Sequence, residues 1–411
     1  MTDRRYHLPA YYAFTALWYL RPVSALWILY LLHVGWSLWQ VGVAEAGWHI
    51  ASLLSDLPTG AFADRYGRRL SMAIGIAIGA VQPLAVYAAA PASVALGTVA
   101  FALGALGYTF VGGADRALLY GIAAASPAGA AGYGGLYGRV VQVSYLAESV
   151  GAAAGGLIAT RLGWAWPYSL TAASQALALV SLFALPAHIP SAGADGAPPR
   201  SPLRLMAEAL RAVRSRPPLA RLVAFGGVFL LATALTSLYA QSTLVLRGAS
   251  VALATILIAA SNLCAAAASA VGGRLAQRAA RPALQLGAAA LALLIALSGS
   301  LPLAAAAAAF LAFKAGDGLL DPVYETSLNR ETPEAVRATV LSAPGTAFSL
   351  GMIALFPLAG ALMAARHVAL AYAGLGALLA LGALTLASGR ARSRPRADLG
   401  KDLARPARTL G

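Results

Sequence analysis

Eight ionisable residues interrupt long apolar stretches of this sequence, and they are the first candidates for chemistry. They are Arg21, Glu45, Asp56, Glu148, Lys314, Asp317, Asp321 and Glu325. An ionisable side chain at the middle of a bilayer costs about 2.5–3.5 kcal/mol on insertion scales. Each of them therefore needs a partner, a water path or a function. The chemistry open to such a set is proton carriage, binding of a polar solute, or structural ion pairing.

Glu148 is the first candidate for a proton-carrying acid. It follows Arg139 by nine residues, and a helical rise of about 1.5 Å per residue then puts it near the middle of its stretch. No basic residue is close to it in the sequence. The alternative role is a carboxylate held by hydrogen bonds between two helices.

Two charge pairs are predicted among the other candidates. Lys314 and Asp317 are three residues apart, so they share one face of a helix and can neutralise each other. This pair either faces a substrate or is purely structural. Arg21 is predicted to reach Asp56 if it lies low in the first helix.

The remaining acids are predicted to lie near the membrane surfaces. Glu45 falls near one end of its stretch, where water can hydrate it. Asp321 and Glu325 fall near the opposite surface, where Arg330 or Arg337 can join them in a network.

The elements that position these residues are membrane-spanning helices. Hydrophobic residues make up 59% of the 411 and charged residues only 11%, whereas soluble domains contain about 25% charged residues. About 20 mostly apolar residues cross the hydrocarbon layer. Twelve segments meet that criterion: 12–33, 39–62, 70–90, 93–113, 137–159, 166–186, 219–240, 250–272, 283–301, 303–325, 338–363 and 367–388.

Positive charge falls almost entirely on one side of these segments. Of the 30 Lys and Arg residues, only Arg161, Arg247 and Arg366 fall between segments on the opposite side. Cytoplasmic loops carry the excess of Lys and Arg. The pattern therefore predicts a multi-pass protein of the cell membrane with both termini in the cytoplasm.

The chain divides into two halves of six segments each. We expect a bundle over 1–186, a cytoplasmic linker over 187–218, a second bundle over 219–388 and a basic tail over 389–411. Within the linker, apolar residues recur at helical spacing opposite arginines, which predicts an interfacial helix; the alternative is a solvated linker. These residues are Leu203, Met206, Leu210 and Val213, opposite Arg204, Arg211 and Arg214.

A motif at the end of the second segment is repeated in the second half. Residues 60–68 read Gly-Ala-Phe-Ala-Asp-Arg-Tyr-Gly-Arg, and residues 273–281 read Gly-Arg-Leu-Ala-Gln-Arg-Ala-Ala-Arg. Gly273, Arg278 and Arg281 are the second-half candidates for a gate, although Gln277 replaces the acid. The repeat favours two parallel six-helix halves around a central path, for which the major facilitator superfamily is itself the standard example.

Residues 60–69 resemble the signature loop of the major facilitator superfamily, Gly-x-x-x-Asp-Arg-x-Gly-Arg-Arg. Residues 56–59, 113–120, 328–333 and 337–342 are similar to a drug-exporter-like bacterial branch of that family. The resemblance implies an all-α fold of twelve transmembrane helices in two pseudo-symmetric bundles. It also implies alternating-access transport of a small molecule, with proton-coupled efflux of a hydrophobic or amphipathic compound as the leading expectation.

The resemblance gives the signature loop the role of a cytoplasmic latch. Gly60 and Gly67 would permit close helix approach and a tight turn, and Asp64 would accept hydrogen bonds from a helix N-terminus. Arg65, Arg68 and Arg69 would bridge to carboxylates such as Asp115 when the cytoplasmic side is shut. The alternative is a loop whose positive charge only sets the topology.

Gly151, Gly155 and Gly156 resemble the antiporter motif of the fifth helix in this family. Ala152 stands where the family has proline, which leaves antiport in question. Small residues that allow close helix packing are the alternative explanation.

Three other classes of function remain as alternatives to efflux. Proton-coupled uptake of a metabolite is the first, and a non-transporting membrane sensor or scaffold is the second. A membrane-embedded enzyme is disfavoured, because the five His residues are scattered and Cys264 is the single cysteine. We expect no cofactor, no metal site and no nucleic-acid partner; the expected partners are the substrate, protons and the bilayer, with the protein acting as a monomer.

Overall fold

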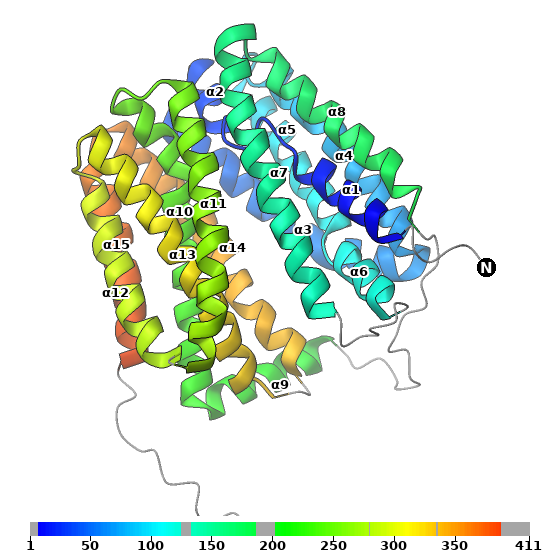
Figure 1. The fold of residues 1–411 in the computed structure, drawn as a ribbon, viewed down its shortest axis with the longest axis vertical. Helices are drawn as coiled ribbons and strands as arrows, with labels where there is room; N and C mark the ends of the chain where they lie inside the picture. Colours follow the sequence, from blue (N-terminus) through cyan, green and yellow to red (C-terminus); the bar gives the residue numbers. More distant parts are fainter. Residues whose placement is uncertain (1–6, 125–132, 186–201, 279, 334–335, 388–411) are drawn as a thin grey trace, which may run out of the picture.

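The computed structural model describes residues 7–124, 133–185, 202–278, 280–333 and 336–387, and all regular structure in these ranges is α-helical (Figure 1). The first half contains α1 (His7–Tyr19), α2 (Trp27–His33), α3 (Leu38–Tyr66), α4 (Arg68–Ala89), α5 (Val94–Val111), α6 (Ala114–Ala124), α7 (Tyr133–Leu162) and α8 (Ala165–Leu182). After α9 (Pro202–Ser215), the second half contains α10 (Pro217–Leu246), α11 (Val251–Arg278), α12 (Ala280–Ser298), α13 (Leu303–Glu331), α14 (Arg337–Ala364) and α15 (Val368–Ala387).

Eight of the described helical paths are long and apolar enough to cross a membrane. They are α4, the path that runs through α5 and α6, and α10 to α15. The other four predicted segments correspond to α1 with α2, to α3, to α7 and to α8. α3 and α7 carry ionisable residues such as Asp56 and Glu148. The fourth path also continues beyond the predicted end at residue 113, because α6 prolongs it to Ala124.

The two halves use the same pattern of neighbours. In the first half α3 packs on α5, α4 on α8, and α1 on α8; in the second half α11 packs on α13, α12 on α15, and α10 on α15. When the six paths of each half are numbered in order, both halves show the same three contacts: path two with path four, path three with path six, and path one with path six. Figure 1 shows the halves side by side, the first in blue to teal and the second in green to red.

The first path is broken, which corrects the prediction of a continuous helix over 12–33. Carbonyl groups at the break lose their partners within the helix, and a bilayer offers no water to replace them. Polar side chains of α8 supply the partners instead. Ser174 Oγ donates to the Leu20 carbonyl at 2.7 Å, and Gln175 Nε2 donates to the Trp18 carbonyl at 2.9 Å.

Glycines of α7 make room for this break. A Cβ at Gly151 would lie 3.0 Å from the Arg21 nitrogen, and a Cβ at Gly155 would overlap the Pro22 carbonyl group. The alternative explanation of these glycines, close packing, is therefore present at Gly151 and Gly155, and its partner is the backbone at the break. The antiporter motif stays a prediction.

The two halves meet along two seams, α3 against α14 and α7 against α11. Toward the end of the molecule that carries α2, glycines let the backbones of the two halves approach closely. A Cβ at Gly42 would meet the Pro357 backbone, a Cβ at Gly360 would meet the Leu38 carbonyl, and a Cβ at Gly156 would meet Thr255. We call this the α2 end and the opposite one the α9 end.

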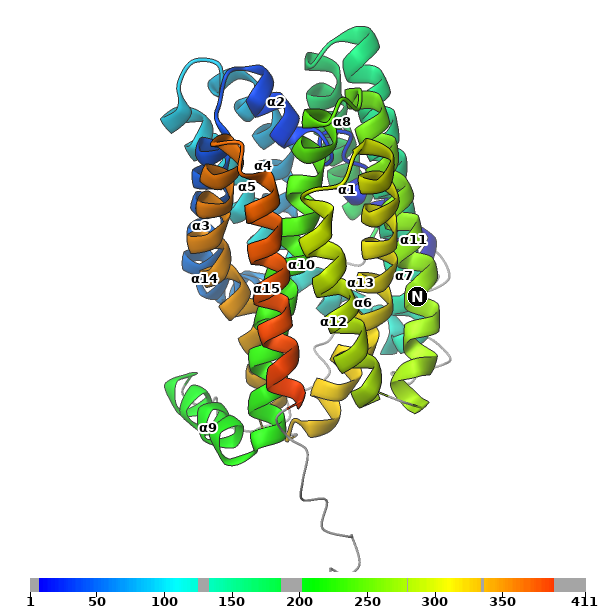
Figure 2. The ribbon, with the colours of Figure 1, turned by 90° about the vertical axis from the view of Figure 1, so that its left-hand side faces the viewer.

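α9 lies across the α9 end and packs against α10 and α14 (Figure 2). Ala209 is buried, whereas Met206 and Leu210 are 61% and 50% exposed. Arg216 alone separates α9 from α10. The predicted linker helix is therefore present; residues 187–201 of the linker and the tail over 389–411 lie outside the described residues.

Candidate functional site

Glu148 has basic electrostatic neighbours in both halves. Its electrostatic neighbours are Arg21, at the break in the first path, and Lys314, on α13 of the second half. No basic residue is close to Glu148 in the sequence, so both neighbours are brought to it by the fold. The break in the first path and the α7–α11 seam bring together three charges that are far apart in the chain.

Arg21 is held in place by the break itself. Its Nε donates to the Trp18 carbonyl at 2.9 Å, and its guanidinium carbon lies 4.4 Å from the centroid of the Trp18 ring. Its charged neighbour is Glu148. The predicted pairing with Asp56 is wrong in this structure, because the break orients Arg21 toward α7 while Asp56 lies exposed on α3.

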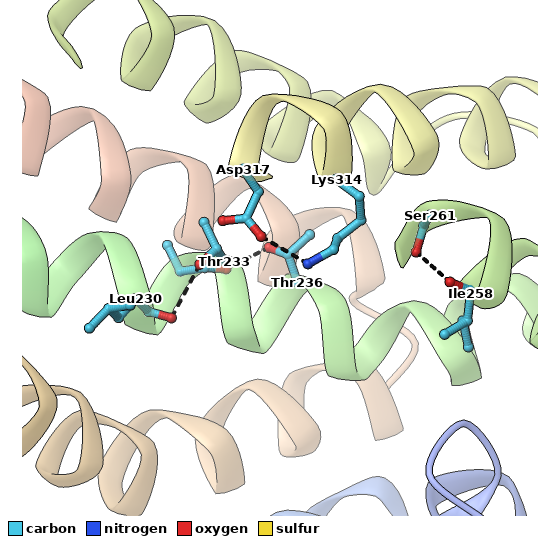
Figure 3. Close-up of polar contacts among 8 residues, drawn as sticks. Leu230, Thr233, Thr236, Ile258, Ser261, Lys314 and Asp317 are labelled. Carbon is cyan, nitrogen blue, oxygen red and sulfur yellow. Dashed lines mark hydrogen bonds and ion pairs between the residues drawn. The ribbon is translucent and has the colours of Figure 1, made fainter. Parts of the chain in front are cut away.

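The predicted pair of Lys314 and Asp317 is confirmed. Lys314 Nζ lies 2.8 Å from Asp317 Oδ2, and the two side chains are only 16% and 18% exposed. Figure 3 shows both side chains projecting from α13 toward α10, where Thr233 and Thr236 lie close to them. Ser261 of α11 lies on the other side of Lys314 in this view. The ion pair of Lys314 and Asp317 thus lies near hydroxyl-bearing residues of α10 and α11.

Further acids of α13 face the first half. Tyr145 of α7 has Asp317 and Asp321 as electrostatic neighbours. Glu325 has Arg116 of α6 as its charged neighbour. Among the described contacts, neither Arg330 nor Arg337 forms the predicted ion pair with these acids. Arg330 Nη1 donates to the Ala276 carbonyl at 3.2 Å.

The signature loop ends α3 in the predicted tight turn. Gly67 has a φ of 99°, which a residue with a Cβ rarely adopts. Gly60 corrects the prediction of close helix approach: it is exposed, and a Cβ there would meet nothing within 4 Å. The α9 end of α3 has no helix packed against this glycine.

The arginines of the signature loop bind backbone groups rather than acids. Arg68 Nη1 donates to the Ala117 carbonyl at 3.3 Å, and Arg69 Nη2 donates to the Phe183 carbonyl at 3.0 Å. Asp64 and Arg65 are exposed. Among the described residues Asp64 makes no ion pair with Arg65, Arg68 or Arg69, so the latch stays a prediction for another conformation.

Asp115 is engaged at the start of α6. Its Oδ1 accepts a hydrogen bond from the Arg116 backbone N–H at 2.6 Å, and its carbonyl accepts one from Tyr11 at 3.1 Å. An acid at a helix N-terminus is favoured by the helix dipole. The predicted bridge from the signature arginines to this acid is absent from the described contacts.

The second-half counterpart is also open in this structure. A Cβ at Gly273 would meet nothing within 4 Å. Arg281 Nη2 lies 3.9 Å from Glu331 Oε1 at the surface, and Arg278 is the last residue of α11.

A cavity of about 80 Å³ opens among α1, α5, α6 and α7. Aromatic rings dominate its wall, and Asp115 and Arg116 contribute the charges. The rings belong to Tyr11, Phe14, Trp18, Tyr19, Tyr108 and Tyr137. Such a wall offers apolar area and a few polar groups, but the cavity is smaller than the roughly 300–1,000 Å³ of small-molecule sites, so a substrate would need it to widen.

Sequence reasoning missed the hydroxyl groups beside the ion pair and misjudged Glu45. Thr233, Thr236 and Ser261 are 5%, 3% and 1% exposed. In the sequence, these residues could have been noticed as polar residues within apolar helices. Glu45 is 8% exposed rather than hydrated, because α3 turns it toward α14 and α10. It pairs with His49, one helical turn away.

We predict a non-additive response when the ion pair on α13 is broken. Lys314→Met or Asp317→Asn alone leaves a charge without its partner, so each should lower the free energy of unfolding by about 3 kcal/mol. The double substitution should cost less than either single one, since a buried pair adds little net stability. Thermal unfolding in detergent measures all three variants. Two single effects that simply add would contradict the pair.

Comparisons with known proteins agree with this architecture. The sequence profile of the Major Facilitator Superfamily matches residues 10–247, more than half of the chain. The uncharacterized MFS-type transporter YxaM of Bacillus subtilis (strain 168) is 42% identical over 65 residues, which is 15% of this chain and 16% of that protein. The chain thus covers about a sixth of this curated relative.

Solved structures of low sequence identity share the fold. A variant of the nucleoside transporter NupG has a TM-score of 0.77 and 14% identity, over 93% of this chain and 100% of that one. A bacterial homolog of the human lysosomal transporter Spinster, in an inward-facing and occupied conformation, has a TM-score of 0.68 and 16% identity, over 94% and 95%. The D-xylose-proton symporter has a TM-score of 0.66 and 17% identity, over 92% and 95%.

The predicted fold of two six-helix halves is confirmed by the matching neighbour pattern and by these structures. The family model and the shared fold agree with the signature loop at the end of α3. The chain therefore belongs to the Major Facilitator Superfamily, a family of multi-pass membrane transporters.

Proposed function

We propose that this protein exports a small hydrophobic or amphipathic compound from the cell in exchange for protons, by alternating access. One observation supports the coupling most strongly: Glu148 of the first half has Arg21 of its own half and Lys314 of the other as electrostatic neighbours. The ionisation of a single acid with cationic neighbours in both halves depends on how the two halves are placed relative to each other.

The proposed coupling follows from charge balance. Ionised Glu148 attracts Lys314 across the path and favours contact between the halves at that depth. Protonated Glu148 no longer attracts Lys314, which keeps Asp317 as its partner at 2.8 Å. A proton on Glu148 therefore weakens the attraction between the halves, and the free energy of proton binding becomes available to their movement.

The proposed substrate class rests on the aromatic cavity of the first half. Its rings offer apolar area, and Asp115 and Arg116 offer opposite charges. The resemblance to a drug-exporter-like branch supports export as the direction. We place the α9 end in the cytoplasm of a cell-membrane protein, because the positive-inside pattern assigns the basic loops to that side, and we propose a monomer.

A second candidate is proton-coupled uptake of a polar metabolite. Lys314 and Asp317 with the neighbouring hydroxyls of Thr233 and Thr236 can bind a polar solute in the second half. The nucleoside and D-xylose transporters that share the fold are, by their names, transporters of such solutes.

The test is reconstitution in liposomes with an imposed pH gradient and a panel of compounds. Proton movement that begins on addition of an amphipathic compound supports export, and proton movement with nucleosides or sugars supports uptake. A non-transporting sensor or scaffold would move neither protons nor compounds in any condition, and that result would overturn the proposal.

A further inference from the structure

A second ionisable pair lies away from Glu148, on α3. Glu45 and His49 are one helical turn apart, with Glu45 Oε1 3.5 Å from His49 Nε2. The two residues are only 8% and 7% exposed. A buried charge is costly unless it is neutralised by a partner, so the protonation of His49 decides the net charge of the pair.

The side chains that bury this pair include residues of the second half. The His49 ring meets the Phe348 ring of α14 edge to face, with centroids 5.2 Å apart. Glu45 is an electrostatic neighbour of Tyr239 on α10. Closer to the α2 end, Gly42 of α3 packs on the Pro357 backbone. Separation of α3 from α14 would therefore expose the pair to water.

Few other ionisable groups act on the pair. Tyr239 donates its hydroxyl hydrogen to the Phe356 carbonyl at 2.7 Å and is a neutral neighbour. The ionisable groups on the other helices packed against α3 are Tyr30 and His33 on α2, Arg68, Arg69 and Tyr87 on α4, Tyr108 on α5 and Arg337 on α14. Arg68, Arg69 and Arg337 begin their helices at the α9 end, far along α3 from Glu45.

Charge balance then links seam closure to one proton. A carboxylate beside a neutral imidazole carries one net negative charge, whereas a carboxylate beside an imidazolium carries none. The closed α3–α14 seam favours the neutral pair, and an open, hydrated seam tolerates the charged one. By linkage, the equilibrium between closed and open seams shifts by up to about tenfold per pH unit.

We propose that Glu45 and His49 form a proton-binding site that closes the α3–α14 seam at the α2 end when it is occupied. The site is separate from Glu148. It rests on the proposed alternating movement of the halves, but it requires no particular substrate.

The test measures access to the seam with a membrane-impermeant maleimide. Cys264→Ser removes the native thiol, and Leu38→Cys places a new one where the seam buries residue 38. Ala365→Cys, at an exposed position of the same end, corrects for the pH dependence of the thiol reaction itself. In proteoliposomes, the corrected labelling rate at position 38 should rise with pH by several-fold per unit.

Two substitutions of the pair should act in opposite directions. Glu45→Gln leaves a neutral pair without a proton, so labelling should stay low at every pH. His49→Gln leaves a carboxylate without its base, so labelling should be high at neutral pH. A wild-type pH slope in both variants, or an equal rise in both from lost packing, would overturn the proposal.

Glu148→Gln separates this proposal from the proposed function. In that variant the pH slope of labelling should persist, whatever happens to coupled flux. A slope that disappears with Glu148→Gln and survives Glu45→Gln would assign the proton to Glu148 and overturn the site on α3.

Discussion

Glu148→Gln is expected to reduce proton-driven flux to the level of protein-free liposomes. The amide cannot release a proton, so the variant resembles the protonated state permanently. Its attraction to Arg21 and Lys314 is lost, and the imposed pH gradient can no longer act through residue 148. Exchange of labelled for unlabelled compound, which needs no net proton movement, should continue. Liposome flux assays with and without the gradient measure both activities.

A matched control exists for this substitution. Glu331 lies at the surface, 39% exposed at the side chain, and its contact with Arg281 spans 3.9 Å. Exposed ion pairs contribute little, so Glu331→Gln should retain coupled flux. Gradient-driven accumulation that persists in Glu148→Gln would rule out Glu148 as the coupling acid.

Gly155→Ala is expected to cost about 1–3 kcal/mol of stability, the range for overpacked cores. The added Cβ would overlap the Pro22 carbonyl at the break in the first path. α7 would have to move away from the break, and the hydrogen bonds from α8 to that backbone would be disturbed. Thermal unfolding of the purified protein in detergent should show a lowered Tm.

Gly345→Ala on α14 is the control for this change. It is also a glycine inside a long helix, but a Cβ there would meet nothing within 4 Å. Alanine favours helices over glycine by about 0.5–1 kcal/mol, so the control should be neutral or more stable. Equal Tm values for the two alanine variants would show that α7 tolerates a side chain at the break.

The spanning segments, the two halves and the linker helix were predictable because each depends on local apolar length and repeated pattern. The ion pair of Lys314 and Asp317 was predictable for the same reason, since its members share one helix face. The turn at Gly67 followed from a motif. In each case the information lies within a few residues of the feature.

Contacts between distant helices were not predictable from spacing. Arg21 lies beside Glu148 rather than Asp56 because the first path breaks, and that break depends on Ser174 and Gln175 of α8. The burial of Glu45 depends on α14, which is contributed by the other half of the chain. The position of a residue along its helix can be read from the sequence. Which neighbouring helix its side chain faces depends on how the helices pack.

The single residue between α9 and α10 has a mechanical consequence for the transporter. We propose that α9 lies along the lipid headgroups. A helix in that position that continues almost directly into a spanning helix resists tilting of the half to which it is fixed. The first half has no such support in the described structure. We expect the second half to keep a constant angle to the bilayer plane while the first half swings against it.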